Sequence, residues 1–218
     1  MSINAAGVYS DDRQRSENKP YMTDCIVFTG GGTGGHVYPG LAVVRKLKQR
    51  WPGEIIWIGS RGGMEKRIVE KTSIPFSGIP AGKMRRYFSL LNFIDIFNVV
   101  GGFFIAFFIL LFKSPRLVFS KGVYVSVPVV VAAFILGIPV ITHECDYDPG
   151  IATRINARFA DRILVSFRET VSFFSQREQK KTVWTGNPVR DEIRAGDPAE
   201  GRRIAGCGPD RLLVLIMG

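Results

Sequence analysis

Seven short apolar runs, rich in β-branched residues, alternate along the chain with stretches that have helical periodicity. The runs cover residues 25–30, 54–59, 74–79, 116–120, 138–144, 162–166 and 182–186. Helices are expected over 39–50, 63–71, 125–136, 149–159 and 169–176, and over 88–112 as one long apolar helix or a broken pair. Strands that alternate with helices favour parallel pairing through right-handed crossovers. The sequence therefore predicts an α/β fold with a Rossmann-like, doubly wound parallel sheet.

The two ends of the chain differ in composition and pattern from this core of alternating strands and helices, which spans 23–190. Residues 1–22 are polar and lack the apolar stretch of a signal peptide, so a disordered leader is expected there. Residues 191–210 are polar and rich in Gly and Pro, which predicts a linker with one short helix. The final stretch, "RLLVLIMG" (211–218), is typical of a first strand of a truncated second domain.

A glycine-rich loop, "TGGGTGG", follows the first run and includes Gly30, Gly31 and Gly32. Glycines let the backbone approach a ligand closely, and a helix that starts there offers free N–H groups to phosphate. So many glycines favour a phosphate site over a tight turn that only packs helix on strand. The pattern matches the dinucleotide fingerprint, although the second strand ends without the acidic residue that holds the ribose. Arg61 at that position suits a 2′-phosphate, so NADP stays open, whereas a Walker A loop is excluded.

Both histidines of the chain fall at the carboxyl ends of predicted strands, where ligands of open parallel sheets bind. A helix N-terminus favours the neutral imidazole of His36, which can then act as a base, although a structural role stays open. His143 and Glu144 end the fifth strand, and either contact a ligand or support residues that do. Asp148 precedes a proline and predicts a helix N-cap, while Asp146 lies between these groups. Their spacing matches no metal motif, so no metal is expected.

Residues 83–116 form a strongly apolar segment with basic residues at its start. Its charge-free part, 99–112, is shorter than the about 20 residues of a spanning helix. A buried core helix, a transmembrane span and a monotopic membrane patch are the three alternatives. The patch is favoured, because the net charge of +10 would then meet an anionic leaflet. Its expected residues are Lys83, Arg85, Arg86, Phe88, Leu91, Phe103 and Phe104.

The remaining composition excludes some classes of function. Three cysteines without CxxC spacing indicate free thiols in a reducing compartment. The excess of 29 Lys and Arg over 19 Asp and Glu attracts polyanions, but no nucleic-acid motif accompanies it. Nucleic acid is therefore not expected as a partner.

Five motifs together resemble the MurG family, the bacterial peptidoglycan glycosyltransferases of the GT-B class, over residues 24–218. They are "GGTGGHVYPGLAV", "SKGVYVSVP", "GIPVITHE", "PGIATRINARFA" and "GNPVR", in this order. The resemblance implies transfer of N-acetylglucosamine from UDP-N-acetylglucosamine to the muramoyl C4 hydroxyl of lipid I, with inversion, which gives lipid II. It implies no cofactor, no obligatory metal and a peripheral location on the cytoplasmic face of the bacterial cell membrane. Other cell-wall synthesis proteins are candidate partners.

The resemblance also assigns roles to single residues. It implies that Thr33, Gly34 and Gly35 bind the donor diphosphate, that Arg190 contacts the donor, and that His36 lies near the acceptor hydroxyl. His36 or Glu144 is then the candidate catalytic base.

Asp146 is a candidate donor contact that stands where many members of the family have Asn. A carboxylate accepts but does not donate, so this contact stays open. In this family the N-terminal domain takes the acceptor, so the chain is expected to be the acceptor half and inactive, or nearly so, alone. The alternatives are an NADP-dependent oxidoreductase and a non-enzymatic, membrane-bound scaffold.

Overall fold

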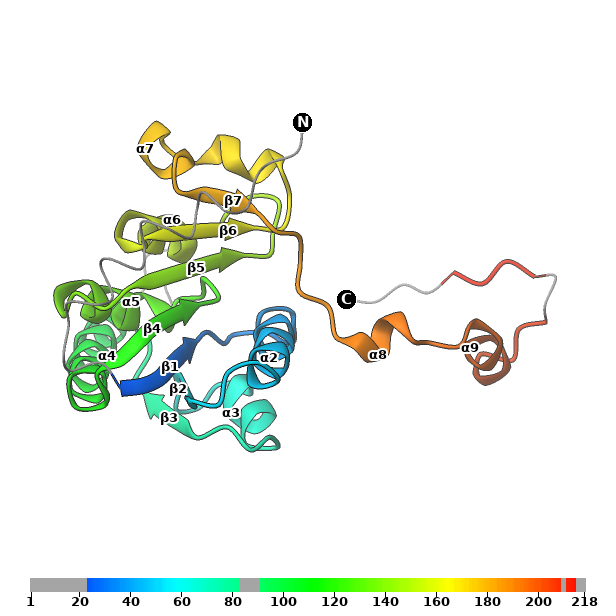
Figure 1. Ribbon diagram of the computed structural model, residues 1–218, viewed down its shortest axis with the longest axis horizontal. Coiled ribbons are helices and arrows are strands. Elements are labelled where there is room, and N and C mark those ends of the chain that lie inside the picture. The colour runs from blue at the N-terminus through cyan, green and yellow to red at the C-terminus, as the bar shows by residue number, and fades with distance from the viewer. Residues whose placement is uncertain (1–22, 83–90, 209–210, 215–218) are drawn as a thin grey trace.

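The computed structural model describes residues 23–82, 91–208 and 211–214. Within these ranges seven strands form one parallel sheet in the order β3-β2-β1-β4-β5-β6-β7 (Figure 1). The strands are β1 (Thr23–Thr29), β2 (Glu54–Ser60), β3 (Phe76–Ile79), β4 (Pro115–Ser120), β5 (Val140–Glu144), β6 (Arg162–Val165) and β7 (Thr182–Trp184). The predicted Rossmann-like sheet is confirmed, and its strand order reverses between β1 and β4. The predicted leader, 1–22, lies outside the described residues.

Helices cover both faces of the sheet, as a doubly wound fold requires (Figure 1). One face carries α2 (Gly34–Lys48) and α3 (Met64–Val69), and the other carries α4 (Leu91–Lys113), α5 (Ser126–Ile135) and α6 (Ile151–Phe159). The segment between β6 and β7 holds the 3₁₀ helix η2 (Glu169–Phe173) and α7 (Gln176–Gln179), where a single helix is predicted. After β7 come two short helices, α8 (Asp191–Arg194) and α9 (Pro198–Ile204), rather than the predicted one.

The two helical layers explain why the strands are apolar on both sides. Val27 and Ile58 face a core shared with α4 and α5, whereas their neighbours Phe28 and Trp57 face a second core shared with α2 and α3. Side chains of a strand point alternately to opposite faces. A strand buried on both faces therefore appears as a continuous apolar run, as the sequence predicts.

Helix α2 begins earlier than predicted. The expected start was Pro39, because proline suits the first turn, but the helix begins at Gly34 and contains Pro39. Glycine has a low helix propensity, so this turn resembles a loop in sequence. Burial of Val37 against the core with Trp57 holds the extra turn in place. His36 consequently lies inside the first turn of α2.

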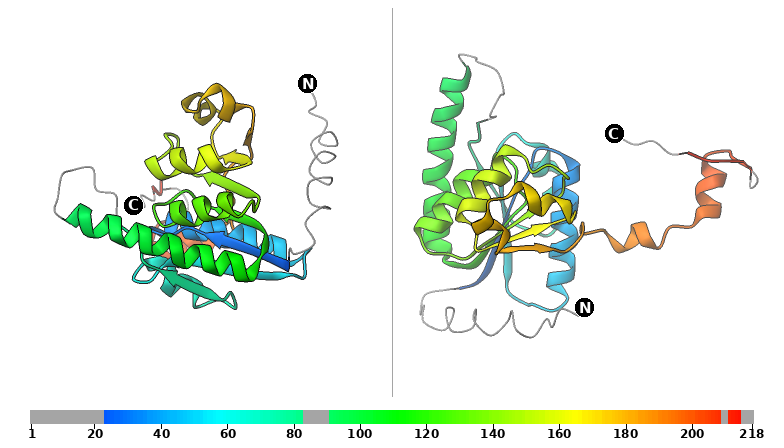
Figure 2. Two further views of the ribbon diagram at one scale, coloured as in Figure 1. Left: turned by 90° about the vertical axis from the view of Figure 1, so that its left-hand side faces the viewer. Right: turned by 90° about the horizontal axis from the view of Figure 1, so that it is seen from above.

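Helix α4 is one continuous helix over its described length, not a broken pair, and it crosses the sheet face beside α5 (Figure 2). Ala106 and Leu110 bury its inner side against that face. Among the described helices, none combines the length and apolar character needed to cross a membrane.

The last part of the described chain extends away from the sheet (Figure 1). Residues 211–214 are exposed and carry no regular element, while 215–218 lie outside the described residues. The predicted strand over 211–218 and the domain that it would begin therefore stay predictions.

Candidate functional site

The loops that follow β1 and β4 meet where the strand order reverses. Open parallel sheets bind ligands at this point, because the two neighbouring loops leave toward opposite faces. The loop after β5 joins them, since Asp146 lies within reach of His36. The structure thus brings His36 and Asp146, two of the candidate residues, together at this end of the sheet.

The first three glycines of the loop are required by packing within the protein. A Cβ on Gly30 would lie 2.7 Å from the Lys121 Cβ, and one on Gly31 would collide with the Glu65 carboxylate. Gly32 has φ of +80°, which side chains rarely adopt. These three glycines are therefore explained by close packing and by backbone conformation. The sequence alone favours a phosphate site over such a tight, packed turn.

The next two glycines differ, because Gly34 and Gly35 form the first residues of α2. The first N–H groups of a helix have no helical acceptor, and the helix dipole makes this end attractive to anions. A Cβ on Gly35 would make only ordinary contact, at 3.6 Å from the Thr33 Oγ1. The start of α2 is therefore the part of the loop whose geometry suits a phosphate.

His36 is held so that one ring nitrogen faces the site. Its Nδ1 lies 3.0 Å from the Thr33 Oγ1, and its Nε2 lies 4.0 Å from the Asp146 Oδ2. The backbone N–H of Asp146 donates to Glu144 Oε1 at 2.9 Å, so this buried carboxylate orients the loop that carries Asp146. The structure therefore brings His36, Glu144 and Asp146 together.

This triad offers two kinds of chemistry. A partly exposed imidazole that donates its Nδ1–H to the Thr33 hydroxyl, in the tautomer that this contact allows, can take a proton on Nε2, and a nearby carboxylate stabilises the cation that forms. One ligand atom from each of the three residues also lies within 4.8 Å of the others, so among the described residues this is a place where a divalent cation could bind.

His143 is a buried supporting residue rather than a group in the open crevice. It is 1% exposed, its Nδ1 lies 2.6 Å from the Lys121 Nζ, and its Nε2 lies 3.2 Å from the Gly186 carbonyl oxygen. Burial and the adjacent Lys121 lower the pKa of His143 to about 3, so the ring is neutral. Nε2–H then donates to Gly186, and Nδ1 accepts from the lysine. This chain of contacts ties the end of β5 to the loops that follow β4 and β7.

Lys121 is a residue that the sequence did not single out. Its Nζ also donates to the Cys145 Sγ at 2.9 Å, and burial lowers its pKa. In the sequence, Lys121 directly follows the apolar run "RLVFS". A lysine at the end of a buried strand is unusual, because lysine is rarely buried, and this position is the feature that could have pointed to it.

Glu65 is a second residue that the sequence did not single out, and it anchors the glycine loop. Its fully buried carboxylate accepts from the Gly32 N–H at 3.2 Å, the Ser60 N–H at 2.8 Å and the Ser60 hydroxyl at 2.5 Å. The carboxylate thus joins the loop after β1 to the end of β2. No sequence motif marks it, because its role depends on this tertiary contact.

Asp148 does not cap α6, which overturns the N-cap prediction. The cap position is Gly150, because Pro149 and Gly150 precede the first helical turn. The Asp148 carboxylate instead accepts from Arg154 Nη2 at 2.7 Å.

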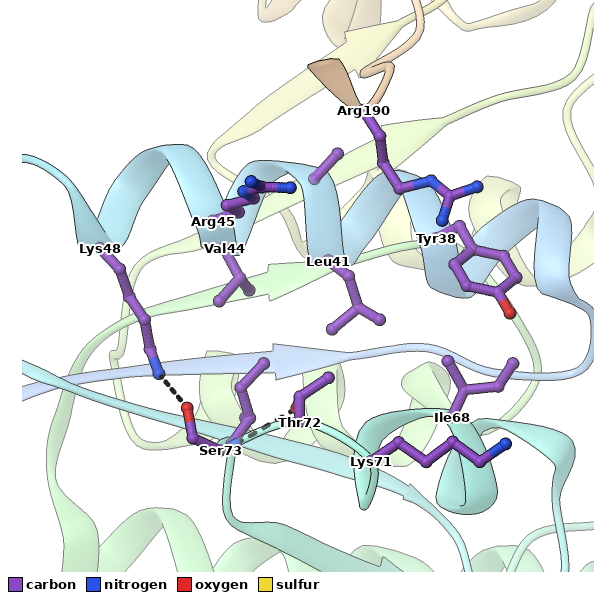
Figure 3. Close-up of a pocket in the computed structure, with 12 residues that line it drawn as sticks. Tyr38, Leu41, Val44, Arg45, Lys48, Ile68, Lys71, Thr72, Ser73 and Arg190 are labelled. Atoms are coloured by element: carbon purple, nitrogen blue, oxygen red, sulfur yellow. Dashed lines mark hydrogen bonds between the residues drawn. The ribbon is translucent and has the colours of Figure 1, made fainter. Parts of the chain in front are cut away.

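Arg190 lies beside α2, where its guanidinium carbon sits 4.8 Å from the centre of the Tyr38 ring. Both residues line a groove of about 460 Å³ between α2 and α3 (Figure 3). Figure 3 shows Lys48 reaching across it toward Ser73, with Leu41 and Val44 on its apolar wall. The ring of Tyr38 also adjoins Gly34, so Arg190 approaches the start of α2 through Tyr38.

The predicted membrane patch falls largely on residues that are not described. Lys83, Arg85, Arg86 and Phe88 lie outside the described residues, and Leu91 is described only as the start of α4. Phe103 packs against the core, whereas Phe104 is 54% exposed. Phe104 belongs to an exposed apolar row on α4 that consists of Phe97, Val100, Phe104, Phe108, Leu111 and Phe112.

Comparison with curated proteins gives relatives that include two bacterial proteins of the same name. A Treponema denticola protein, named UDP-N-acetylglucosamine--N-acetylmuramyl-(pentapeptide) pyrophosphoryl-undecaprenol N-acetylglucosamine transferase, is 50% identical over 202 residues, 89% of this chain and 52% of the relative. A Clostridium kluyveri protein of the same name is 45% identical over 193 residues, 88% of this chain and 54% of the relative. The chain therefore spans about half the length of the curated relatives it matches.

Solved structures share the fold. The crystal structure of Acinetobacter baumannii MurG matches with a TM-score of 0.62 and 28% identity, over 78% of this chain and 47% of that one. A UDP-GlcNAc 2-epimerase from Neisseria meningitidis matches with a TM-score of 0.57 and 14% identity, over 84% of this chain and 50% of that one, which shows a common fold alone.

The family model described as the glycosyltransferase family 28 N-terminal domain matches residues 26–165, which hold the sheet from β1 to β6 and the His36, Glu144 and Asp146 triad. Because this match covers more than half of the sequence, the chain belongs to glycosyltransferase family 28.

Proposed function

We propose that this chain is the acceptor-binding half of an inverting transferase. The enzyme moves N-acetylglucosamine from UDP-N-acetylglucosamine to the muramoyl C4 hydroxyl of lipid I and gives lipid II for peptidoglycan. The observation that carries the proposal is the convergence of His36, Glu144 and Asp146 beside the first turn of α2. The names of the curated relatives support this pair of substrates.

In this proposal His36 is the catalytic base. Its Nε2 takes the proton of the acceptor hydroxyl as the oxygen bonds to the anomeric carbon and the bond to the diphosphate breaks. Asp146, 4.0 Å away, stabilises the imidazolium that forms. Glu144 is 2% exposed and already accepts from the Asp146 N–H, so it is better suited to positioning than to proton transfer.

The departing diphosphate is stabilised by the start of α2. Negative charge grows on it as the glycosidic bond breaks, and the free N–H groups of Gly34 and Gly35 can bind that charge. Thr33 orients His36 through the contact between its hydroxyl and Nδ1. Arg190 contributes a cation beside Tyr38.

A transfer assay tests the proposal. Radiolabelled N-acetylglucosamine and a lipid I analogue are offered to the chain alone, to the chain joined to the remaining half of the Treponema denticola relative, and to the joined His36→Ala variant. Only the joined protein is expected to transfer sugar, and the substitution should lower its rate about 10²-fold or more, as loss of a general base does. Circular dichroism of each protein serves as the folding control.

Two outcomes would contradict the proposal. Transfer by the chain alone would show that the acceptor and donor sites are not divided between the two halves. No transfer by a folded joined protein would show that the substrates are misassigned.

We also propose that the protein lies on the cytoplasmic face of the cell membrane, with the exposed apolar row of α4 in the lipid. Phenylalanine and leucine side chains can bury their apolar area at such an interface. A Phe104→Ser and Phe108→Ser double variant should float less with anionic vesicles than the unchanged protein. Ile204→Ser, at an exposed apolar position on α9, is the matched control and should float normally. Equal flotation of all three proteins would contradict this placement.

A further inference from the structure

The amine of Lys121 has unusual neighbours for a buried lysine. The side chain is 1% exposed, and its hydrogen-bond partners in the described chain are the imidazole Nδ1 of His143 and the thiol of Cys145. A buried ammonium normally pairs with a carboxylate, because an unpaired buried charge is costly. This environment therefore favours the free amine.

The protonation of the pair follows from burial. Burial lowers the pKa of the Lys121 amine and raises the pKa of the Cys145 thiol. The Nζ donates to both the His143 Nδ1 and the Cys145 Sγ, so nitrogen and sulfur already lie 2.9 Å apart, and rotation about the Cε–Nζ bond turns the lone pair of the free amine toward the sulfur.

Cys145 is the more exposed member of this pair. It is partly exposed, whereas Lys121 is buried. Cys25 is 1% exposed, and burial raises the pKa of its thiol to about 11. Cys207 is partly exposed but lies 3.9 Å from the Arg202 guanidinium, which is not a nucleophile. In the described chain, Cys145 is thus a reachable thiol in contact with an amine.

We propose that hydrogen peroxide converts Lys121 and Cys145 into a covalent sulfenamide crosslink. The Lys121 amine first takes the thiol proton, and the thiolate attacks peroxide, which gives a sulfenic acid and a hydroxide that leaves as water with that proton. The free amine then attacks the sulfur. An N–S bond forms, the S–O bond breaks, and the oxygen leaves as a second water with one amine proton. Two electrons pass from the pair to one peroxide, and the protein loses two hydrogen atoms.

The crosslink would act on the site that the proposed function uses. It would join the residue after β4 to the residue after β5 and draw the Lys121 nitrogen toward the sulfur, with a single N–H left to donate to the His143 Nδ1. The hydrogen bond that, together with the Gly186 contact, holds this imidazole would be weakened. Oxidation is therefore expected to slow the transfer reaction, and reduction by a thiol to restore it, a consequence that rests on the proposed function.

The crosslink itself is tested by mass spectrometry, independently of sugar transfer. The purified chain is treated with hydrogen peroxide, digested, and searched for a peptide pair that joins Lys121 to Cys145 and is lighter by two hydrogen atoms. Dithiothreitol should remove the pair. Cys145→Ser and Lys121→Arg should not form it, and Cys207→Ser should form it normally. Because Cys145→Ser changes a single atom, it keeps the test valid if Lys121→Arg folds poorly.

Three results would overturn the proposal. They are oxidation of Cys145 to sulfinic acid without a link to Lys121, oxidation of Cys207 while Cys145 stays reduced, and the same crosslink in Cys145→Ser. Each is read from the mass spectrum. A failed sugar transfer would leave the crosslink standing, so the two proposals fail separately.

Discussion

Glu65 shows how a single buried carboxylate can shape a glycine-rich loop. Each of its two oxygens accepts from a backbone N–H, Oε2 from Gly32 and Oε1 from Ser60, so the N–H₂ of a glutamine would face a backbone donor in either orientation. Glu65→Gln should therefore lower the free energy of unfolding by about 1–3 kcal/mol, the usual cost of an unsatisfied buried polar group. Urea denaturation of the chain measures it.

The matched control for Glu65 is Glu70 at the end of the same helix. Its carboxylate lies 3.9 Å from the Lys66 Nζ, and both side chains are about half exposed. Exposed pairs of this kind contribute about 0–1 kcal/mol, so Glu70→Gln should leave stability nearly unchanged. Equal effects of the two substitutions would show that the Glu65 contacts do not hold the loop.

His143 predicts how stability depends on pH. Its pKa is about 3 in the fold, because of burial and Lys121, against an ordinary 6.5. The unfolded chain therefore binds the extra proton between about pH 6.5 and 3, and stability falls as the pH falls through this window. From pH 7 to pH 5 the loss is about 2 kcal/mol. His143→Asn should reduce this dependence of stability on pH, as measured by the urea midpoints at pH 7 and pH 5. If the dependence is unchanged, groups other than His143 cause it.

At the scale of elements, α4 contains two adjacent glycines whose replacement by alanine should change stability in opposite directions. A Cβ on Gly102 would collide with the Pro80 carbonyl oxygen, whereas a Cβ on Gly101 would meet nothing within 4 Å. Alanine has a helix propensity about 1 kcal/mol better than glycine. Gly101→Ala should therefore raise the melting temperature and Gly102→Ala should lower it. A rise in both would mean that α4 packs less closely on the end of β3.

The elements also show which features sequence can predict. The seven strands were predictable because burial on both faces makes each one a continuous apolar run. The start of α2 was not, because Gly34 and Gly35 resemble a loop until the packing of Val37 is known. The predicted N-cap of α6 was wrong for a similar reason, since the Asp148 carboxylate pairs with Arg154 instead of accepting from the backbone at the helix end.

For the whole molecule, the topology explains why the candidate site was only partly predictable. His36, Glu144 and Asp146 follow strand ends, so a parallel sheet must bring them to one edge, and they do meet there. Lys121 and Glu65 gain their roles from contacts between loops that are far apart in sequence. The residue type alone does not predict that a lysine or a glutamate is buried. The family resemblance carried by five motifs is confirmed, while the roles it assigns to single residues stay proposals.

The net charge of +10 is a property of the whole chain, and it predicts how membrane binding should respond to salt. Basic residues near an anionic surface each contribute about 1 kcal/mol, and the screening length falls from about 10 Å at 0.1 M salt to about 3 Å at 1 M. Flotation with anionic vesicles should therefore weaken at least about tenfold across this range. The smaller binding to neutral vesicles, which depends on the apolar row of α4, should change little. If binding to anionic vesicles does not change with the salt concentration, the apolar contact alone holds the protein at the membrane surface. The positive charge of the protein would then have another partner.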